Sequence, residues 1–483
     1  MRYREVLTYP IAVRRDATQP LREQIAEQIA AAVDGGTAQR GARVPSTRTL
    51  AELLGVSRGV VGEAYDLLHS RGYLVTRPGS GTFISGGSEP ANPVRTSAAP
   101  QWTVDFTPGQ LCGEAFPIRA WRAAWRYASH QVPAPMAAPA LGMPSLRRAI
   151  AEHLAQTRGI VAPDHEVVVT AGTAAGLRLV LEVLGGPIAL ERPISPDLLR
   201  ATTAAAWAQP PSGSLSSGSL PLGSVLAAAI RPLPADFDDL PHDVRVAVVC
   251  PDGNRPLGTV MSEPVRRAAL AWSRAGGTLV EVARDAIFLP HVAGLPRLQP
   301  SPGTVTVGGF GEVLAPSLRL GYALVPRELA AAMADLITDR GEQPPDLTQL
   351  AVARLLLDGT MVRQMRRLTR LYAAKWSIVA ATLTQDPAIC RANRAPSPPR
   401  PVYCQANCGI LPGEAGTALI PFPDATTSER LRHNGIRLPT LDAYGNPDQT
   451  FVLGFGHLPD KALRESLSHL VSSLGCSTLK EKR

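Results

Sequence analysis

The sequence predicts an α/β protein in two parts, a small helical N-terminal unit and a large domain with a mostly parallel sheet. Three observations lead to this prediction. Residues 18–86 show three helical patterns and a hairpin pattern, residues 87–103 are polar and rich in small residues, and helical and strand patterns alternate over much of the remaining chain. A chain of 483 residues is long enough for both parts to bury a core.

Composition narrows the class of protein. No apolar run is long enough for a membrane span, and the N-terminus lacks the apolar segment of a secretory signal. Six cysteines without even spacing indicate a reducing compartment, so we expect a cytoplasmic protein. Cys404 and Cys408 have no further cysteine or nearby histidine to complete a zinc site, and no metal site is predicted.

The split of the basic residues into lysines and arginines is more informative than their total number. Of the 49 lysines and arginines only four are lysines, namely Lys375, Lys461, Lys480 and Lys482. Residues 1–374 therefore contain no lysine, which excludes any chemistry that needs an amine side chain there. Residues 1–85 hold 11 arginines against 8 acidic residues, so the net charge of +8 is spread along the chain and DNA binding must rest on a motif.

Capping residues and apolar spacing delimit three helices in the N-terminal unit. Thr18 is a candidate cap for a helix over residues 18–36, in which apolar residues recur every four positions. Ser46 can cap a second helix over 47–54, and Ser57 can cap a third. Two short helices joined by a three-residue turn that contains glycine form a helix-turn-helix.

A hairpin pattern over residues 72–84 follows the third helix and turns at Pro78-Gly79-Ser80-Gly81, which makes it a wing. Arg48 and Arg58 lie early in the second and third helices, and Arg77 lies on the wing. These are positions from which a helix-turn-helix contacts DNA. The alternative is a three-helix module whose arginines are merely solvated, and spacing leaves both interpretations open.

The segment RVPSTRTLAELLGVSRGVVGEAYDLLHSRGYLVTRPGSGTFI, residues 43–84, resembles the winged helix-turn-helix of GntR-type transcription regulators. It carries the PSTR, LGVSR, AYDLL and RPGSGTF elements of that family in order and without gaps. The resemblance implies that residues 18–86 bind double-stranded DNA. The candidate contacts that it implies are Arg43, Ser46, Arg48, Ser57, Arg58 and Arg77.

Strand and helix patterns alternate in the large domain. Short apolar runs typical of buried strands lie at residues 167–169, 244–249, 278–282 and 304–307. Helical patterns lie at residues 147–157, 172–184 and 264–275. This order is typical of α/β organisation with a mostly parallel sheet.

Residues 104–476 resemble the fold-type I aminotransferases, as they occur fused to the GntR module in MocR-type regulators. The matching segments include LGMPSLRRAIAEHLAQTRGI from residue 141, LAPSLRLGYALVP from 314 and FVLGFGHLPDKAL from 451. The resemblance implies a large part of about 104–375, a small C-terminal part of about 376–476, and a homodimer. It also implies pyridoxal phosphate as the family cofactor, and a small-molecule effector if the domain acts as a sensor.

The resemblance locates the residues that would hold this cofactor, and several are altered. Glu312 occupies the position of the Schiff-base lysine, and Val282 occupies that of the carboxylate beside the pyridinium nitrogen. Arg284 replaces a tyrosine, and Ser195 replaces an aromatic residue that stacks on the ring. We therefore expect no internal aldimine and no transaminase activity.

The phosphate-binding end is better preserved. Gly172 and Thr173 open a helix whose backbone N–H groups can face a phosphate, and Arg319 matches the phosphate arginine. A salt bridge from Arg319 to an acid such as Glu312 is an equally open alternative. Glu312 and Arg284 each differ in charge from the family pattern, so they either pair across the pocket or changed independently.

The sequence thus predicts a cytoplasmic, dimeric transcription regulator whose aminotransferase-like domain has lost the Schiff-base lysine. One alternative is a pyridoxal phosphate-dependent aminotransferase with an accessory DNA-binding domain, and another is a C-terminal domain that only dimerises. Arg437 is a candidate for binding a substrate carboxylate. A basic helix face, for which solvation or pairing in a dimer is favoured over DNA binding, consists of Arg363, Arg366, Arg367 and Arg370.

Overall fold

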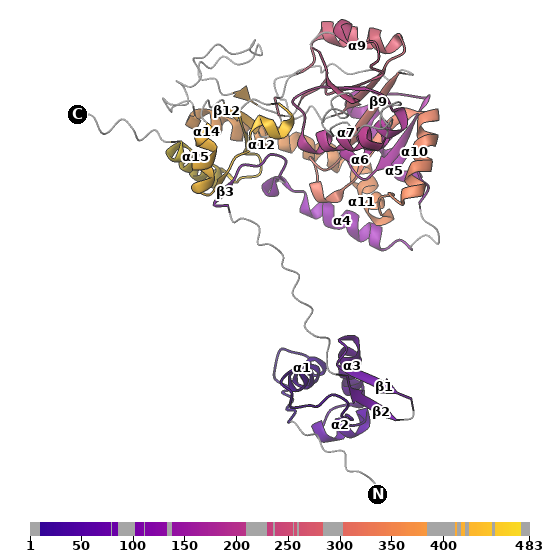
Figure 1. The fold of residues 1–483 in the computed structure, drawn as a ribbon, viewed down its shortest axis with the longest axis vertical. Coiled ribbons are helices and arrows are strands. Elements are labelled where there is room, and N and C mark those ends of the chain that lie inside the picture. Colours follow the sequence, from indigo (N-terminus) through magenta and orange to yellow (C-terminus); the bar gives the residue numbers. More distant parts are fainter. Residues whose placement is uncertain are drawn as a thin grey trace, which may run out of the picture. The chain divides into compact units, whose positions relative to one another are not determined.

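The computed structural model divides into two compact units, Met1–Pro100 and Gln101–Arg483, each with its own hydrophobic core (Figure 1). The structure describes residues 10–78, 80–85, 102–110, 112–132, 138–208, 229–234, 237–254, 256–257, 260–283, 303–383, 411–412, 417–420, 425–446 and 450–474. Within these residues, we find no helix with the length and apolar character that a membrane crossing requires.

The N-terminal unit packs three helices against a two-stranded antiparallel hairpin. The helices are α1 (Leu21–Asp34), α2 (Thr47–Leu54) and α3 (Arg58–Ser70). The hairpin consists of β1 (Leu74–Arg77) and β2 (Gly81–Ile84). One residue of every helix turn faces the shared core, as Ile25 and Ile29 of α1 and Leu68 of α3 illustrate.

The predicted caps of the second and third helices are confirmed. The Ser46 hydroxyl accepts a hydrogen bond from the Thr49 backbone N–H at 3.1 Å, and the Ser57 hydroxyl accepts one from that of Val60 at 3.4 Å. Gly55 ends α2 with a φ of 62°, a left-handed conformation that suits glycine. The second helix therefore begins and ends where the sequence predicts, and the third begins where it predicts.

The predicted start of the first helix is wrong. α1 begins at Leu21 directly after Pro20, and no side chain caps it, so Thr18 has no capping role. The ring of Pro20 holds its φ at −57°, close to the helical value, and the next residue can enter the helix without a side-chain cap.

A seven-stranded sheet forms the centre of the C-terminal unit, in the order β4-β10-β9-β8-β7-β5-β6. Its strands are β4 (His165–Thr170), β5 (Ile188–Leu190), β6 (Ile230–Pro232), β7 (Val246–Val249), β8 (Thr278–Val282), β9 (Thr304–Gly309) and β10 (Gly321–Pro326). The neighbours from β6 to β9 are parallel, whereas β10 is antiparallel to both β9 and β4. The predicted mostly parallel sheet is confirmed.

Helices cover both faces of this sheet, and alternate residues of each strand face opposite layers. Val168 of β4 packs with α6 (Thr173–Leu184), α7 (Pro196–Ala208) and α10 (Arg327–Arg340). Its neighbours Val167 and Val169 pack into the layer of the other face. That face carries α4 (Ile118–Ser129), α5 (Pro144–Arg158), α9 (Glu263–Arg274) and α11 (Asp346–Leu357).

A smaller part completes the C-terminal unit, and the start of the unit returns to it. The long helix α12 (Thr360–Leu383) leads into it. Its further elements are β11 (Leu411–Pro412), β12 (Thr417–Ile420), α14 (Ala425–His433), β13 (Ile436–Arg437), β14 (Phe451–Gly454) and α15 (Asp460–Ser473). Strand β3 (Val104–Asp105) pairs in parallel with β13, so residues at both ends of the unit share one core.

Lys375 lies fully buried in α12 and joins three segments that are distant in the sequence. Its Nζ donates to the Glu114 carboxylate at 2.9 Å and to the carbonyls of Gly456 and Leu458 at 3.1 and 2.6 Å. All three donors of the ammonium group are therefore in use.

We expect Lys375→Met to lower the free energy of unfolding by about 3 kcal/mol, because it leaves two buried carbonyls without a donor. Urea unfolding followed by tryptophan fluorescence measures this loss. Lys461→Met is the matched control, since Lys461 is 90% exposed and only approaches Glu465 at 4.0 Å. Equal stability of the two variants would contradict a structural role for Lys375.

Candidate functional site

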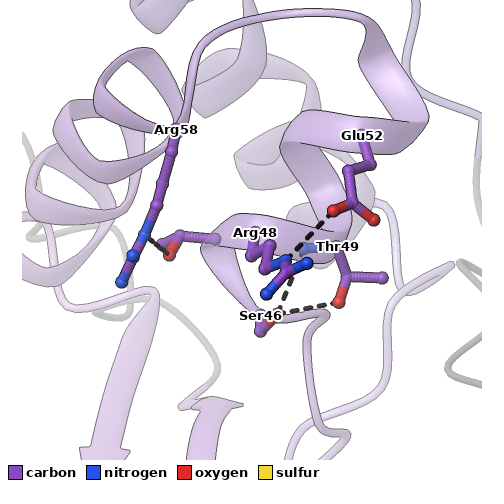
Figure 2. Close-up of polar contacts among 6 residues, drawn as sticks. Ser46, Arg48, Thr49, Glu52 and Arg58 are labelled. Atoms are coloured by element: carbon purple, nitrogen blue, oxygen red, sulfur yellow. Dashed lines mark hydrogen bonds and ion pairs between the residues drawn. The ribbon is translucent and has the colours of Figure 1, made fainter.

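The N-terminal ends of α2 and α3 lie together in the helix-turn-helix. The Arg58 guanidinium donates to the Thr47 hydroxyl at 3.4 Å, and that of Arg48 donates to the Glu52 carboxylate at 3.1 Å (Figure 2). Arg48 stays 81% exposed in this pair. Both predicted arginines therefore present donors to solvent next to the beginning of a helix.

The two predicted serines act through the backbone. Ser46 and Ser57 cap α2 and α3. Figure 2 shows Ser46 beside Thr49, and their hydroxyl oxygens lie 2.7 Å apart. A capped helix N-terminus presents partial positive charge and free N–H groups, which suit a phosphate. Both serines therefore hold in place the ends from which Arg48 and Arg58 project.

The wing brings the remaining two predicted arginines to one aromatic residue. The Arg77 guanidinium lies over the Phe83 ring, 5.1 Å from its centroid. Arg43 pairs with Phe83 through an isolated antiparallel bridge. A Cβ on Gly81 would lie 2.7 Å from Arg43 Nε, so the guanidinium fits only against glycine at that turn. The six predicted contacts are all exposed and form two groups, one at the helix ends and one on the wing.

Sequence reasoning missed Arg22, which pairs with Glu63, one of the two acids of α3. Its guanidinium lies 3.0 Å from the Glu63 carboxylate, and that carboxylate raises the pKa of Arg22. The pair weakens the repulsion that Glu63 would exert on a nearby phosphate. No local pattern signals this contact, because 41 residues separate its partners.

A cavity of about 530 Å³ lies in the C-terminal unit, where the segments after β4, β8 and β9 meet. Six of the seven residues predicted for the altered cofactor site line it, namely Gly172, Thr173, Ser195, Val282, Glu312 and Arg319. The seventh, Arg284, lies outside the described residues, as do Cys404 and Cys408. The proposed pairing of Glu312 with Arg284 therefore stays a prediction.

The N-terminus of α6 and Arg319 form one end of the cavity. Gly172 precedes α6 with a φ of 102°, and no side chain caps the helix. A Cβ on Gly309 would lie 2.4 Å from the Thr173 hydroxyl, so glycine lets Thr173 approach β9 closely. Arg319 is exposed, and it forms no ion pair with any residue that the structure describes. This end supplies backbone and guanidinium donors to an anion.

Acidic, apolar and basic side chains line the rest of the cavity. Glu312 contributes a carboxylate, Val282 contributes an apolar side chain, and no lysine is among the lining residues that the structure describes. Arg437, the candidate carboxylate-binding residue, also lines the cavity and lies 3.5 Å from the Asp105 carboxylate. Tyr444 lines it as well, and nothing in its sequence neighbourhood had indicated this.

Buried charges hold the strand ends beside the cavity. The Arg158 guanidinium, at the end of α5, donates to the carboxylates of Asp252 and Glu281, the former at 2.7 Å. Glu191, after β5, accepts hydrogen bonds from Cys250 N–H at 2.6 Å and from the Asn254 amide at 2.7 Å. Burial raises the pKa of Glu191 despite these hydrogen bonds.

The chain resembles regulators over nearly its whole length. The family model "Bacterial regulatory proteins, gntR family" matches residues 21–84. The HTH-type pyridoxine biosynthesis transcriptional regulator PdxR of Corynebacterium glutamicum is 30% identical over 95% of this chain and 97% of its own. The chain belongs to the MocR-type subfamily of GntR transcription regulators.

Two further comparisons agree with this MocR-type assignment. The probable rhizopine catabolism regulatory protein MocR of Rhizobium meliloti is 27% identical over 96% of this chain and 95% of its own. A multiple substrate aminotransferase from Thermococcus profundus shares the fold, with a TM-score of 0.60 and 16% identity over 78% of this chain and 92% of its own. The predicted function, a DNA-binding transcription regulator with an aminotransferase-like domain, is confirmed.

In this MocR-type regulator, we expect Arg58→Gln to weaken DNA binding by about 1–3 kcal/mol, since it removes a charged donor at the start of α3. Fluorescence anisotropy with a labelled duplex measures the affinity at several salt concentrations. Arg71→Gln at the C-terminal end of α3 is the matched control. If both variants bind as the wild type does, the beginning of α3 does not contact DNA.

A pH effect on stability follows from His153. Burial, together with the charge of Arg158, lowers the pKa of His153 to about 4. The unfolded chain takes up the proton near pH 6.5, so the folded state loses stability as the pH falls from 6.5 toward 4. Between pH 7 and 4.5 we expect His153→Gln to lose about 2–3 kcal/mol less than the wild type.

Urea unfolding at both pH values tests this expectation. His242→Gln, at an exposed histidine, is the control and should follow the wild type. An identical pH dependence for the wild type and His153→Gln would show that His153 does not stay neutral in the folded state.

Proposed function

We propose that the C-terminal unit of this regulator is a catalytically inactive aminotransferase-like domain that binds its effector without a covalent bond. The observation that carries the proposal is the presence of Glu312, and of no lysine, among the described residues that line the cavity. Its structural neighbours are aminotransferases, a class that uses pyridoxal phosphate. Regulation would then depend on binding alone.

The aldehyde end of pyridoxal phosphate does not fit this cavity. An internal aldimine needs an amine, and the carboxylate of Glu312 cannot supply one. Lys375, the lysine nearest in the sequence, does not line the cavity, and its Nζ is engaged with Glu114 and two carbonyls. Val282 offers no charge to a pyridinium nitrogen.

The anionic end of such a ligand fits better. The N-terminus of α6 and the Arg319 guanidinium together suit a phosphate or a carboxylate. Because one relative is named for pyridoxine biosynthesis, phosphorylated pyridoxine vitamers are the first effectors to test. A ligand of the folded state raises the thermal midpoint, which makes thermal-shift screening suitable.

We also propose that the regulator acts in the cytoplasm as a homodimer, with its DNA-binding domain at residues 18–86 and its aminotransferase-like domain at residues 104–476. Two-fold symmetry of a dimer matches the symmetry of a palindromic operator. Six cysteines without even spacing support the reducing compartment.

We expect the wild-type protein with pyridoxal phosphate to show no internal-aldimine absorbance band and no pyridoxyl group fixed by borohydride. The physical reason is that the described part of the cavity lining offers a carboxylate at Glu312 and no amine. Absorbance spectra and peptide mass spectrometry provide the two measurements. Glu312→Lys restores an amine at that position and serves as the positive control for the chemistry.

A band and a fixed pyridoxyl group in the wild type would contradict the proposal. They would favour the alternative, a pyridoxal phosphate-dependent aminotransferase with an accessory DNA-binding domain. A thermal shift with a phosphorylated vitamer in the absence of a fixed pyridoxyl group would support non-covalent sensing. The absence of any shift would favour a domain that only dimerises.

A further inference from the structure

Two helices of the C-terminal unit carry many arginines and no acid. Helix α4 reads IRAWRAAWRYAS, and α12 reads TMVRQMRRLTRLYAAKWSIVAATL. Neither helix contains an aspartate or a glutamate, and the lysine of α12 is the buried Lys375. Their charge is therefore not balanced within the helices themselves.

The arginines of α4 are exposed and lack acidic partners. Arg119, Arg122 and Arg126 follow the spacing i, i+3 and i+7, which places them on one side of the helix. All three are exposed, and none forms an ion pair with a residue that the structure describes. The contrast with α9 is direct, since Arg266 and Arg267 there both approach Glu263.

Contacts with α11 and with the turn before α4 connect helix α4 to helix α12. The Arg354 guanidinium of α11 lies over the Tyr127 ring of α4, 5.6 Å from its centroid. Arg367 of α12 donates to the Glu114 carbonyl at 2.8 Å, in η1 (Gly113–Ala115), which shortly precedes α4. We name the whole set the arginine face, which consists of Arg119, Arg122, Arg126, Arg354, Arg363, Arg366, Arg367 and Arg370.

Little negative charge opposes the arginine face. Asp358 approaches Arg363 at 3.9 Å, but Arg363 also donates to the Asp358 carbonyl and the Thr360 hydroxyl. Among the residues that the structure describes, Arg370 donates only to the Arg366 carbonyl, and Arg367 only to that of Glu114. A guanidinium that donates only to neutral carbonyls keeps its full positive charge. Its remaining donors can still bind an anion.

We propose that the arginine face binds the phosphate backbone of duplex DNA beside the site that the N-terminal unit reads. Guanidinium groups bind phosphate oxygens through paired donors, and such contacts need no particular base sequence. The N-terminal unit already brings the protein to DNA. Sixteen residues, 86–101, separate the described parts of the two units, and a chain of that length reaches at most about 55 Å.

Charge complementarity favours DNA over a second copy of this chain on the arginine face. A two-fold interface brings a patch against the same patch of the partner. For the arginine face, that arrangement would set guanidinium groups against one another with no acid of α4 or α12 to separate them. A duplex instead presents a phosphate charge about every 1.7 Å of its axis.

The test uses the full chain and a random-sequence duplex of about 60 base pairs, which can reach both units. We compare the wild type with Arg119→Gln/Arg122→Gln/Arg126→Gln and with the control Arg245→Gln/Arg267→Gln/Arg274→Gln. The control removes three exposed arginines outside the arginine face, so the net charge changes equally. A second variant, Arg366→Gln/Arg370→Gln, tests α12 separately, and thermal midpoints verify folding.

We expect the α4 variant to bind at least tenfold more weakly at low salt, with a salt dependence shallower by about 3 in log–log slope. The control should differ from the wild type by less than threefold. The same loss should persist when Arg48→Gln/Arg58→Gln has weakened the N-terminal unit, because the two surfaces act separately. Equal binding by the α4 variant and the control would overturn the proposal.

Light scattering measures the oligomeric state and so tests the alternative, in which a second copy of this chain covers the arginine face. If the α4 variant changes the oligomeric state, the arginine face is an interface between copies and the proposal is wrong. An unchanged oligomeric state together with weaker, less salt-dependent binding supports a second DNA-binding surface.

Discussion

The C-terminal unit depends on one buried guanidinium, that of Arg158. This arginine ends α5, is 6% exposed, and pairs with Asp252 after β7 and with Glu281 in β8. Two carboxylates buried beside each other repel strongly unless a cation compensates them, and removing one partner of such a network costs several kcal/mol. Arg158 therefore fixes a helix end to two neighbouring strand ends. The end of β8 and the residue after it form part of the cavity wall, through Val282 and Ala283.

The alternation of residues along β8 separates this support from the chemistry of the cavity. Glu281 faces Arg158, whereas the next residue, Val282, lines the cavity. A change at the cavity position leaves the ion network on the other face intact. At the end of β9, Gly308 packs against Tyr322, whereas Gly309 approaches Thr173 and lines the cavity with Glu312. The aminotransferase fold can thus persist in a regulator while the residues that would hold its cofactor differ.

Local sequence signals predicted the helices and strands of this protein better than they predicted contacts between side chains that are distant in the sequence. Ser46, Ser57 and Gly55 mark the ends of α2 and α3 because capping chemistry acts within a few residues. The residues that flank Glu312 and Val282 match the family pattern and so located both positions in the sequence, and both side chains line the cavity. The sequence did not predict β5, β6 or β10, because strands of three residues and a reversed strand lack a local signature. Pairs such as Arg22 with Glu63, or Lys375 with Glu114, depend on tertiary packing that no spacing reveals.

Arginine serves several physical roles in this lysine-poor chain, and the neighbouring acids decide among them. Arg158 pairs with two buried carboxylates, so its charge is neutralised within the fold. Arg48 shares a single exposed carboxylate and keeps donors exposed to solvent. Arg119, Arg122 and Arg126 have no carboxylate within reach in the described structure, so their charge remains available to an external anion. A net charge of +8 distinguishes none of these cases. An arginine without an acidic partner gains the most free energy when it binds a phosphate. The placement of acids along the chain therefore carries more information about anion binding than the number of arginines does.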